Sequence, residues 1–410
     1  MPIHPRLALL AIAAAASQLP AQAGWSPPQA ATALNSTAAD SGPHLSFDGL
    51  TLHFSSFRSG NWEIYQSTRS APGAAWSVPA LVTELSDSSV EDQPFLAFGD
   101  LELYFGSMRA GGAGGLDILR CTRPAQNLPW SPPTFVTELN SSGSDSAFSM
   151  TLDGLEAFFL TTGFGSPSGN NNAIFRAVRT STSQPFGTPS LVTELWNPNT
   201  HRDCEIAWDG LSIVYTEFIG SRLKVLHATR PTRNDPFGPP VVWSEFDSVG
   251  TATGVFSFTR SYTGNDAYLA AGFSAAAGGQ EIMSTKFNGL TQAGRAGLGS
   301  FMNLHLRDSA RPGHWYSIGA ALGNTGFVIG SRTVPLDPDW LLFATLGVDV
   351  AGYTAGWGGT LDANGEAFAS LTCSAAWLLG FDLHVGALVW DVSGPFGVGL
   401  VANSIPVKFH

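Results

Sequence analysis

The chain has 410 residues, a formal net charge of −12 at pH 7 and only 13% charged residues. Because the sequence contains no basic stripe or cluster, this balance argues against binding to nucleic acid or to an anionic membrane surface. The low charge content, 46 glycines and 11% aromatic residues are typical of a β-rich exported protein.

The first 23 residues have the features of a secretory signal peptide. A short basic region ends at Arg6, an apolar run covers residues 7–16, and Ala21-Gln22-Ala23 is a small-residue cleavage signal. The apolar run is much shorter than the roughly 20 residues that a membrane-spanning helix needs. We therefore predict a signal peptide over residues 1–23, no membrane insertion after its removal, and a secreted, periplasmic or cell-surface location.

A repeated segment dominates the chain from residue 25 onward. In each copy an aromatic residue is followed three positions later by Pro, and the segment ends in Val-Thr-Glu-Leu or a variant of it. The copies begin at Trp25, Trp76, Trp130, Phe186 and Phe237, so the period is 51 to 56 residues. Self-similarity at such a period predicts a repeat architecture.

One period contains the strands of one propeller blade. Residues 44–54 form two alternating runs joined at Asp48-Gly49, a dipeptide that favours a tight hairpin turn. Residues 62–69 and 79–85 supply a third and a fourth strand, so each period predicts a four-stranded antiparallel sheet. The first copy is a lone strand at 28–34 and the fifth unit has only three strands. We therefore expect the N-terminal strand to complete the last blade and close the ring.

Residues 43–65 resemble the WD40-like propeller repeat of TolB-type proteins, here of the secreted bacterial type. That repeat typically reads Pro-x-Leu-Ser-x-Asp-Gly, an apolar strand, Ser-x-Arg-x-Gly and Asp-Ile-Tyr, and the first unit matches it nearly throughout. The second unit matches through Pro94, Ser107-Met108-Arg109 and Asp117-Ile118, whereas later units keep only the hairpin and third strand. The resemblance covers residues 25–290 and implies a β-propeller, but no particular ligand or reaction. The TolB propeller has six blades, whereas the repeats here predict five.

The repeats stop at about residue 290, and the composition then changes. Apolar stretches at 340–346, 367–371 and 383–390 are separated by turn signals, as in a small antiparallel sandwich. We predict an all-β chain: a five-bladed β-propeller of four-stranded blades over 24–290, followed by a C-terminal β-sandwich domain over 295–410.

Alignment of the units on the hairpin turn gives a column of candidate ligand-binding residues before the innermost strands. It contains Asp40, Glu91, Asp145 and His201, with Asp92 and Asp203 nearby. In a propeller these positions ring the mouth of the central channel, where loops from every blade converge. Their carboxylates suit a Ca²⁺ ion or the acid and base of glycoside hydrolysis. The simpler alternative is that they are acids that begin each strand. We assign no catalytic residue and no metal ligand.

Two further columns recur with the repeat. Basic residues end the third strands, at Arg69, Arg123, Arg179, Arg230 and Lys286, and acids occupy the fourth, at Glu84, Glu138, Glu194 and Glu245. We expect these two columns to pair between blades, and the repeat aromatics to pack beneath the outer strand. The three cysteines are too few for a disulfide scaffold, and the sequence does not decide whether any two are bridged.

Together these features favour an exported, monomeric and non-enzymatic propeller. Its ligand would be a protein or a carbohydrate, and it would need no cofactor. Two alternatives stay open: a carbohydrate-active enzyme of glycoside hydrolase type with carboxylates at the channel mouth, and a structural component of the cell surface.

Overall fold

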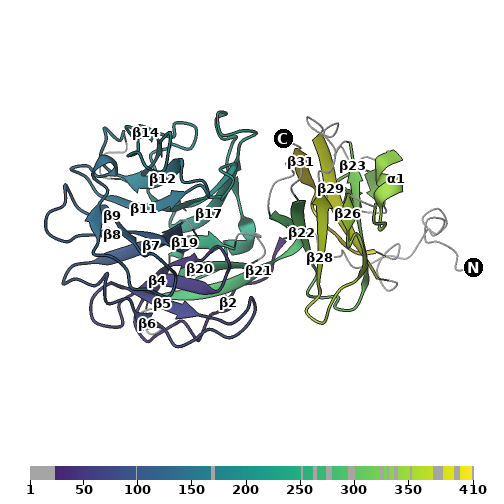
Figure 1. Cartoon of the computed structure of the whole chain (residues 1–410), viewed down its shortest axis with the longest axis horizontal. Helices are drawn as coiled ribbons and strands as arrows, with labels where there is room; N and C mark the ends of the chain where they lie inside the picture. Colours follow the sequence, from purple (N-terminus) through teal and green to yellow (C-terminus); the bar gives the residue numbers. More distant parts are fainter. Residues whose placement is uncertain are drawn as a thin grey trace, which may run out of the picture. The chain divides into compact units, whose positions relative to one another are not determined.

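The computed structural model describes residues 24–97, 99–167, 171–250, 253–261, 266–273, 279–293, 301–322, 327–329, 332–336, 340–350, 353–372, 382–391 and 398–408. The predicted signal peptide and Cys373 lie outside these ranges. The chain divides into two compact units (Figure 1). One contains Pro27–Tyr262 and Asp266–Thr285, and the other contains the residues from Lys286 onward. No described helix is long and apolar enough to cross a membrane.

The first unit consists of four-stranded antiparallel runs in chain order, which confirms the predicted β-propeller fold. Three runs are separate sheets. They are β3–β6 (Asp40–Leu45, Thr51–Ser56, Glu63–Thr68, Ala80–Leu81), β7–β10 (Glu91–Ala97, Glu102–Ser107, Asp117–Thr122, Thr134–Phe135) and β11–β14 (Asp145–Met150, Glu156–Thr161, Ala173–Val178, Ser190–Leu191). Short 3-10 turns follow the fourth strands at Thr137–Leu139 and Ser244–Phe246.

Two more runs share a larger sheet. The first is β15–β18 (His201–Ile206, Ser212–Ile219, Arg222–Thr229, Val241–Val242). The second is β19 (Gly254–Arg260), β20 (Asp266–Gly272), β21 (Gln280–Ala293) and β2 (Gln29–Ala30). A single parallel bridge between Leu223 and Gly254 joins the two runs.

The N-terminal strand completes the last run, as the repeat order predicts. Ala30 pairs with Met283 in β21, and the Ala31 amide donates to the Ile282 carbonyl at 2.9 Å. The Asn35 side chain bonds both backbone groups of Ile282, at 2.7 and 2.9 Å, and Leu34 is fully buried. We call residues 29–35 the latch, because they join the first and last parts of the propeller.

The predicted hairpin at Asp48-Gly49 forms through local side-chain chemistry. Gly49 has a φ of +72°, a conformation that costs glycine little. The Asp48 carboxylate accepts hydrogen bonds from the Leu50 amide at 2.9 Å and from the Ser46 hydroxyl at 2.7 Å. The side chains of residues 46 and 48 therefore help to fix the register of β3 and β4 at this turn.

The four arginines of the basic column bond backbone carbonyls and not the predicted glutamates, so for these four residues that expectation was wrong. Each arginine Nε donates to a carbonyl of the hairpin turn in its own blade and stacks on the repeat aromatic. The Nε–O distances are 2.7 Å for Arg69 to Gly49, 2.7 Å for Arg123 to Asp100, 2.6 Å for Arg179 to Gly154 and 2.7 Å for Arg230 to Gly210. The guanidinium carbons lie 4.1 to 4.6 Å from the ring centroids of Trp76, Trp130, Phe186 and Phe237. The carbonyls of the tight turn lie within reach of the guanidinium and take its hydrogen bonds.

Two glutamates of the acidic column, Glu138 and Glu194, bond the backbone of the next repeat. The Glu138 carboxylate accepts a hydrogen bond from the Phe186 amide at 3.2 Å, and Glu194 accepts one from the Phe237 amide at 3.0 Å. These contacts fix the loop that carries the next repeat aromatic. Three of the five aromatics are packed as predicted, since Trp130, Phe186 and Phe237 are buried. Trp25 and Trp76 are half-buried, and Trp25 belongs to the second unit, where its ring contacts Phe287.

The second unit is a sandwich of two antiparallel sheets, as predicted. One sheet pairs β21 with β22 (Phe301–Arg307), β28 (Glu366–Thr372) and β26 (Thr354–Ala355), and β1 (Gly24–Trp25) also pairs with β21. The other contains β27 (Gly358–Thr360), β23 (Trp315–Ala321), β29 (Asp382–Trp390), β30 (Val398–Val401) and β31 (Ile405–Lys408). A small hairpin is formed by β24 (Phe327–Ile329) and β25 (Arg332–Val334). The core between the sheets includes Leu304, Ile318, Trp357 and Val385.

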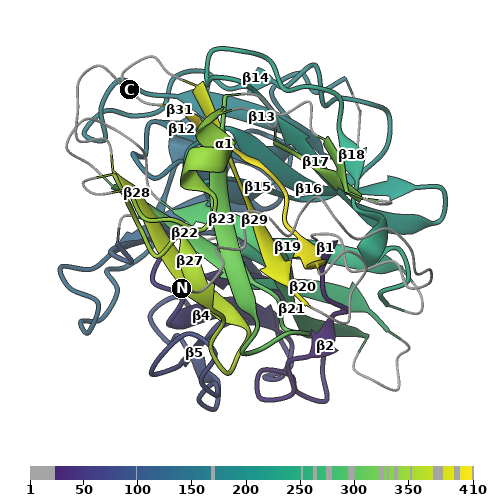
Figure 2. The ribbon, with the colours of Figure 1, turned by 90° about the vertical axis from the view of Figure 1, so that its right-hand side faces the viewer.

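One predicted strand of this unit is a helix. Residues Trp340–Thr345 form α1, which lies beside β23 in Figure 2. The Thr345 hydroxyl donates to the Leu341 carbonyl at 2.8 Å and accepts from the Ala320 amide at 2.9 Å. A short apolar run has the same composition in a buried strand and in a buried helix, so periodicity alone could not separate the two.

Candidate functional site

The four residues of the predicted column are the first residues of β3, β7, β11 and β15, and none of their side chains is exposed. The Asp40 carboxylate accepts from the Ser36 amide at 2.6 Å, the Ser56 hydroxyl at 2.6 Å and Arg58 at 2.7 Å. Arg58 also donates to the Leu34 carbonyl at 2.7 Å. Asp40 thus ties the start of its innermost strand to the preceding loop.

The other members repeat this arrangement with different chemistry. Glu91 accepts from the Ser107 hydroxyl at 3.0 Å and from Arg109 at 3.2 Å. Asp145 accepts from the Ser141 amide at 2.6 Å. His201 donates from Nδ1 to the Asn172 carbonyl at 3.0 Å, and its Nε2 lies 3.6 Å from Glu217. Each side chain has partners within the propeller wall.

Glu91 also forms a buried carboxyl pair with Glu63, the first residue of β5. Burial raises the pKa of Glu91 to about 7, and its hydrogen bond with Glu63 and the charge of Glu63 add to the shift, while Ser107 and Arg109 oppose it. Glu63 is 6% exposed. Two buried carboxyl groups in contact favour holding one proton between them.

We expect this shared proton to make stability depend on pH. The folded protein binds it more tightly than the unfolded chain, in which a glutamate has a pKa of about 4.3. The stabilisation is therefore complete below about pH 4 and is lost as the pH rises to about 7. Thermal denaturation between pH 4.5 and 7.5 should show Tm falling by several degrees, since 1 kcal/mol is worth roughly 2 to 4 °C in a domain of this size.

The Glu91→Gln variant keeps the shape of the protonated side chain and should flatten this trend in Tm. Glu84→Gln, at an exposed glutamate, is the matched control and should keep the wild-type trend. An unchanged pH trend in Glu91→Gln would show that the pair holds no shared proton.

Asp92 and Asp203, the other two predicted residues, lie along the channel. Residues near the starts of the innermost strands β3, β7, β11, β15 and β19, together with residues at or just before the starts of third strands, line a cavity of about 300 Å³. We call it the mouth cavity. Its lining includes the polar side chains Asp92, Asn172, Arg202 and Gln280 and the rings of Trp62 and Phe256.

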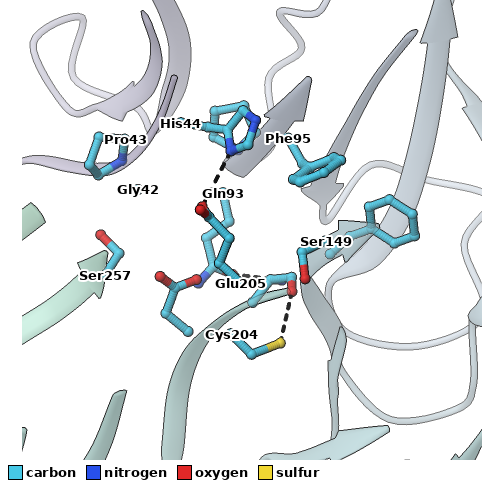
Figure 3. Close-up of a pocket in the computed structure, with 13 residues that line it drawn as sticks. Gly42, Pro43, His44, Gln93, Phe95, Ser149, Cys204, Glu205 and Ser257 are labelled. Carbon is cyan, nitrogen blue, oxygen red and sulfur yellow. Dashed lines mark hydrogen bonds and ion pairs between the residues drawn. The ribbon is translucent and has the colours of Figure 1, made fainter. Parts of the chain in front are cut away.

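A narrower space of about 20 Å³, the inner chamber, continues from the mouth cavity. The two share Gly42, Gln93 and Ser257 as lining residues. Figure 3 shows His44, Glu205 and Ser257 around the inner chamber, with His44 Nδ1 facing a Glu205 oxygen at 3.6 Å. The channel therefore narrows as it passes from the strand starts toward the strand centres.

Gln93 crosses the channel between three innermost strands. Its side-chain amide donates to the Arg202 carbonyl at 2.9 Å and accepts from the Ala147 amide at 3.1 Å. Gln93 has a φ of +53°, and β7 changes register between Asp92 and Phe95. Such a bulge re-aims side chains away from the regular alternation of a strand, which is why the period-two pattern did not identify Gln93.

Burial raises the pKa of Asp203 to about 8, and the nearby charges of Glu205 and Asp92 add to the shift. Asp203 is half-buried and lines the inner chamber. One of its oxygens accepts from the Phe258 amide at 2.9 Å. Burial also raises the pKa of Asp92. At neutral pH, Asp203 is therefore mostly protonated.

Aromatic rings lie beyond the inner chamber, toward the hairpin-turn ends of the strands. Trp208 lies 5.6 Å from Phe47, 6.1 Å from Phe95 and 6.4 Å from His44, measured between ring centroids. These rings pack against each other at one end of the channel. The polar side chains gather at the other end, in the mouth cavity.

The described residues contain no group of three or more His, Cys, Asp or Glu side chains arranged to hold a metal ion. Cys121 and Cys204 are buried free thiols, and burial raises the pKa of both. The sequence singled out Asp92 and Asp203, but it missed Trp62, Gln93 and Ser257, which line the same channel. Their positions in the repeat could have identified them, because Trp62 directly precedes a third strand, whereas Gln93 and Ser257 lie shortly after the start of an innermost strand.

No protein-family model and no curated protein matches the chain. Among solved structures, TolB from Acinetobacter baumannii has a TM-score of 0.38 and 17% identity over 62% of this chain and 56% of that one, little more than half of its length. A thermostable family-43 glycoside hydrolase has a TM-score of 0.42 and 11% identity over 63% of this chain and 90% of that one. An endo-arabinase from Bacteroides thetaiotaomicron has a TM-score of 0.40 and 14% identity over 62% and 97%.

Proposed function

We propose that this chain is an exported binding module whose mouth cavity binds the end of a carbohydrate ligand. The observation that carries the proposal is the lining of that cavity. Amide, hydroxyl and charged side chains that can hydrogen-bond sugar hydroxyls surround it, together with Trp62 and Phe256. A volume of about 300 Å³ is at the lower end of ligand pockets, so one or two sugar rings fit.

The column acids favour binding over hydrolysis. A glycosidase needs two carboxyl groups that reach the scissile bond from either side. Asp40, Glu91 and Asp145 are fully buried and hydrogen-bonded within the propeller wall. Their positions suit a role in holding the strand starts in place.

A hydrolase remains the second candidate because of Asp203. A carboxyl group that is protonated at neutral pH can act as a general acid, and Asp92 lies near enough to raise its pKa. Under this alternative, Asp203 would donate the proton and Asp92 would act as the base or nucleophile.

A glycan binding screen on the protein without residues 1–23 tests both candidates. Trp62→Ala should weaken the affinity for a bound glycan by roughly tenfold or more, equivalent to about 1.4 kcal/mol. Trp196→Ala removes a Trp that is 39% exposed and does not line the cavity, so it should bind like the wild type. Equal affinities in the two variants would refute binding at the mouth cavity. Release of reducing ends by the wild type but not by Asp203→Asn would establish the hydrolase instead.

A further inference from the structure

We propose that the ligand carries a primary ammonium group and that Asp203, Asp92 and Ser257 hold this group at the junction of the mouth cavity and the inner chamber. This inference rests on the proposed function, because it specifies which class of carbohydrate the channel accepts: an amino sugar with a free amine.

The first argument is the balance of charge along the channel. Three carboxyl groups, Asp92, Asp203 and Glu205, come from β7 and β15. Glu205 already has two neighbours of its own, because the His44 imidazole lies 3.6 Å away and the Arg260 amide donates to it at 3.2 Å. The Arg260 guanidinium donates to the Ser212 hydroxyl instead.

Asp203 has no comparable partner among the described side chains. The donors recorded for it are backbone amides, that of Phe258 at 2.9 Å and that of Cys204. Arg202, the nearest cation in sequence, is an exposed residue at the mouth cavity, where it favours the charged form of Asp92. Within the described structure, Asp203 is thus a desolvated carboxyl group without a side-chain cation.

The second argument is a buried hydroxyl. Ser257 is 3% exposed and lines both spaces, and its Oγ has no hydrogen-bond partner among the described residues. A buried polar atom left unpaired costs about 1 to 3 kcal/mol. An ammonium group has three donors and no acceptor. Asp203, Asp92 and Ser257 supply three acceptors for it.

The third argument is size. The inner chamber, at about 20 Å³, has room for a group of about the size of one water molecule. A sugar ring does not fit there, whereas a single –NH₃⁺ group does. The mouth cavity, at about 300 Å³, accommodates the ring to which this group is attached. A bound amino sugar would therefore place its ring between Trp62 and Phe256 and direct its amine inward.

Binding of the ammonium group should displace the proton of Asp203. With a pKa of about 8, this carboxyl group carries a proton at pH 7 and must lose it to face a cation favourably. The affinity for an amine should therefore rise as the pH rises toward 8 and level off above it. The other titratable or charged side chains around this site are His44 from β3, Glu205 and Arg202 from β15, and Arg260 from β19, whose amide bonds Glu205.

Titration calorimetry with D-glucosamine, N-acetyl-D-glucosamine, D-glucose and ethylamine tests the inference. We expect glucosamine to bind at least tenfold more tightly than the two neutral sugars at pH 7. An alkylamine resembles Lys and stays charged at pH 6 to 8, so ethylamine isolates the protein's own titration. Its affinity should increase up to tenfold from pH 6 to 7, with release of close to one proton measured in buffers of different ionisation enthalpy.

Two variants separate charge from fold. Asp203→Asn should remove both the preference for glucosamine and the pH dependence of ethylamine binding. Ser257→Ala should weaken amine binding severalfold and leave its pH dependence intact, because Asp203 still titrates. Equal affinities for glucosamine and N-acetylglucosamine, or ethylamine binding unaffected by Asp203→Asn, would overturn the inference.

The outcomes also distinguish this inference from the proposed function. If neutral sugars bind in a Trp62-dependent manner and the amine adds nothing, the ammonium site is wrong and the carbohydrate module stands. If no sugar binds, but ethylamine binds with proton release that depends on Asp203, the ammonium site stands and the carbohydrate ligand is wrong.

Discussion

Replacement of Arg230 by Ala is expected to lower the free energy of unfolding by about 3 to 4 kcal/mol. Arg230 is 2% exposed and bonds both oxygens of the buried Glu156 at 2.8 Å. It also donates to the Gly210 carbonyl at 2.7 Å and stacks on Phe237. The variant would leave Glu156 buried beside Arg176, its remaining partner, whose side chain is 35% exposed. Urea denaturation monitored by tryptophan fluorescence measures the loss.

Arg179→Ala is the matched control for this variant. Arg179 makes the same two contacts in the preceding blade, with the Gly154 carbonyl at 2.6 Å and with the Phe186 ring at 4.3 Å. The described structure shows no carboxylate partner for it, so its loss should cost only about 1 to 2 kcal/mol. Equal losses in the two variants would mean that the pair with Glu156 adds nothing to stability.

The second large effect is expected at the latch. The double variant Leu34→Ala/Asn35→Ala removes a fully buried leucine and the side chain that bonds both backbone groups of Ile282. Burial of leucine alone is worth about 2 to 5 kcal/mol. The latch lies near the start of the propeller unit, so it can detach while the strands after it stay folded.

Leu139→Ala/Asn140→Ala is the internal counterpart. Leu139 is fully buried, and Asn140 bonds both backbone groups of Ile118 at 2.7 and 3.0 Å. The two double variants should lose similar free energies of unfolding. Amide hydrogen exchange should separate them. The Ala31 amide should exchange at least about a hundredfold faster in the latch variant than the Val136 amide does in the internal variant. Equal exchange rates would contradict a role of the latch as a detachable closure.

Much of the fold follows from chemistry that is local in sequence. Asp48-Gly49 makes its turn with its own side chains and a positive φ, so the hairpin was predictable from two residues. The latch was predictable because the repeats begin with a single extra strand and end with a unit that has only three strands. The extra strand can therefore complete the last unit. The helix α1 was not predictable in this way, because its apolar run fits either structure.

The channel was harder to predict because its residues depend on contacts between blades. Asp92 and Asp203 were found through their column, but the partners that distinguish them from Asp40 are far apart in sequence. Gln93 reaches β11 and β15 only because a bulge turns its side chain into the channel. The arginine column was misassigned for a related reason: the turn carbonyls that it bonds are backbone atoms, which a pattern of side chains does not reveal.

Our central claim is that the buried column acids such as Asp40 stabilise the fold, whereas residues that line the mouth cavity, such as Trp62, bind the ligand. Measuring Tm and ligand affinity together for Asp40→Asn and Trp62→Ala tests this claim most directly. Asp40→Asn should lower the free energy of unfolding by about 1 to 3 kcal/mol, because it weakens the bonds to Ser36, Ser56 and Arg58, and should leave the affinity for a bound glycan unchanged. Trp62→Ala should leave Tm within about 2 °C of the wild type and weaken the affinity roughly tenfold. The opposite pattern, with binding lost in Asp40→Asn and kept in Trp62→Ala, would contradict the assignment of the mouth cavity as the binding site.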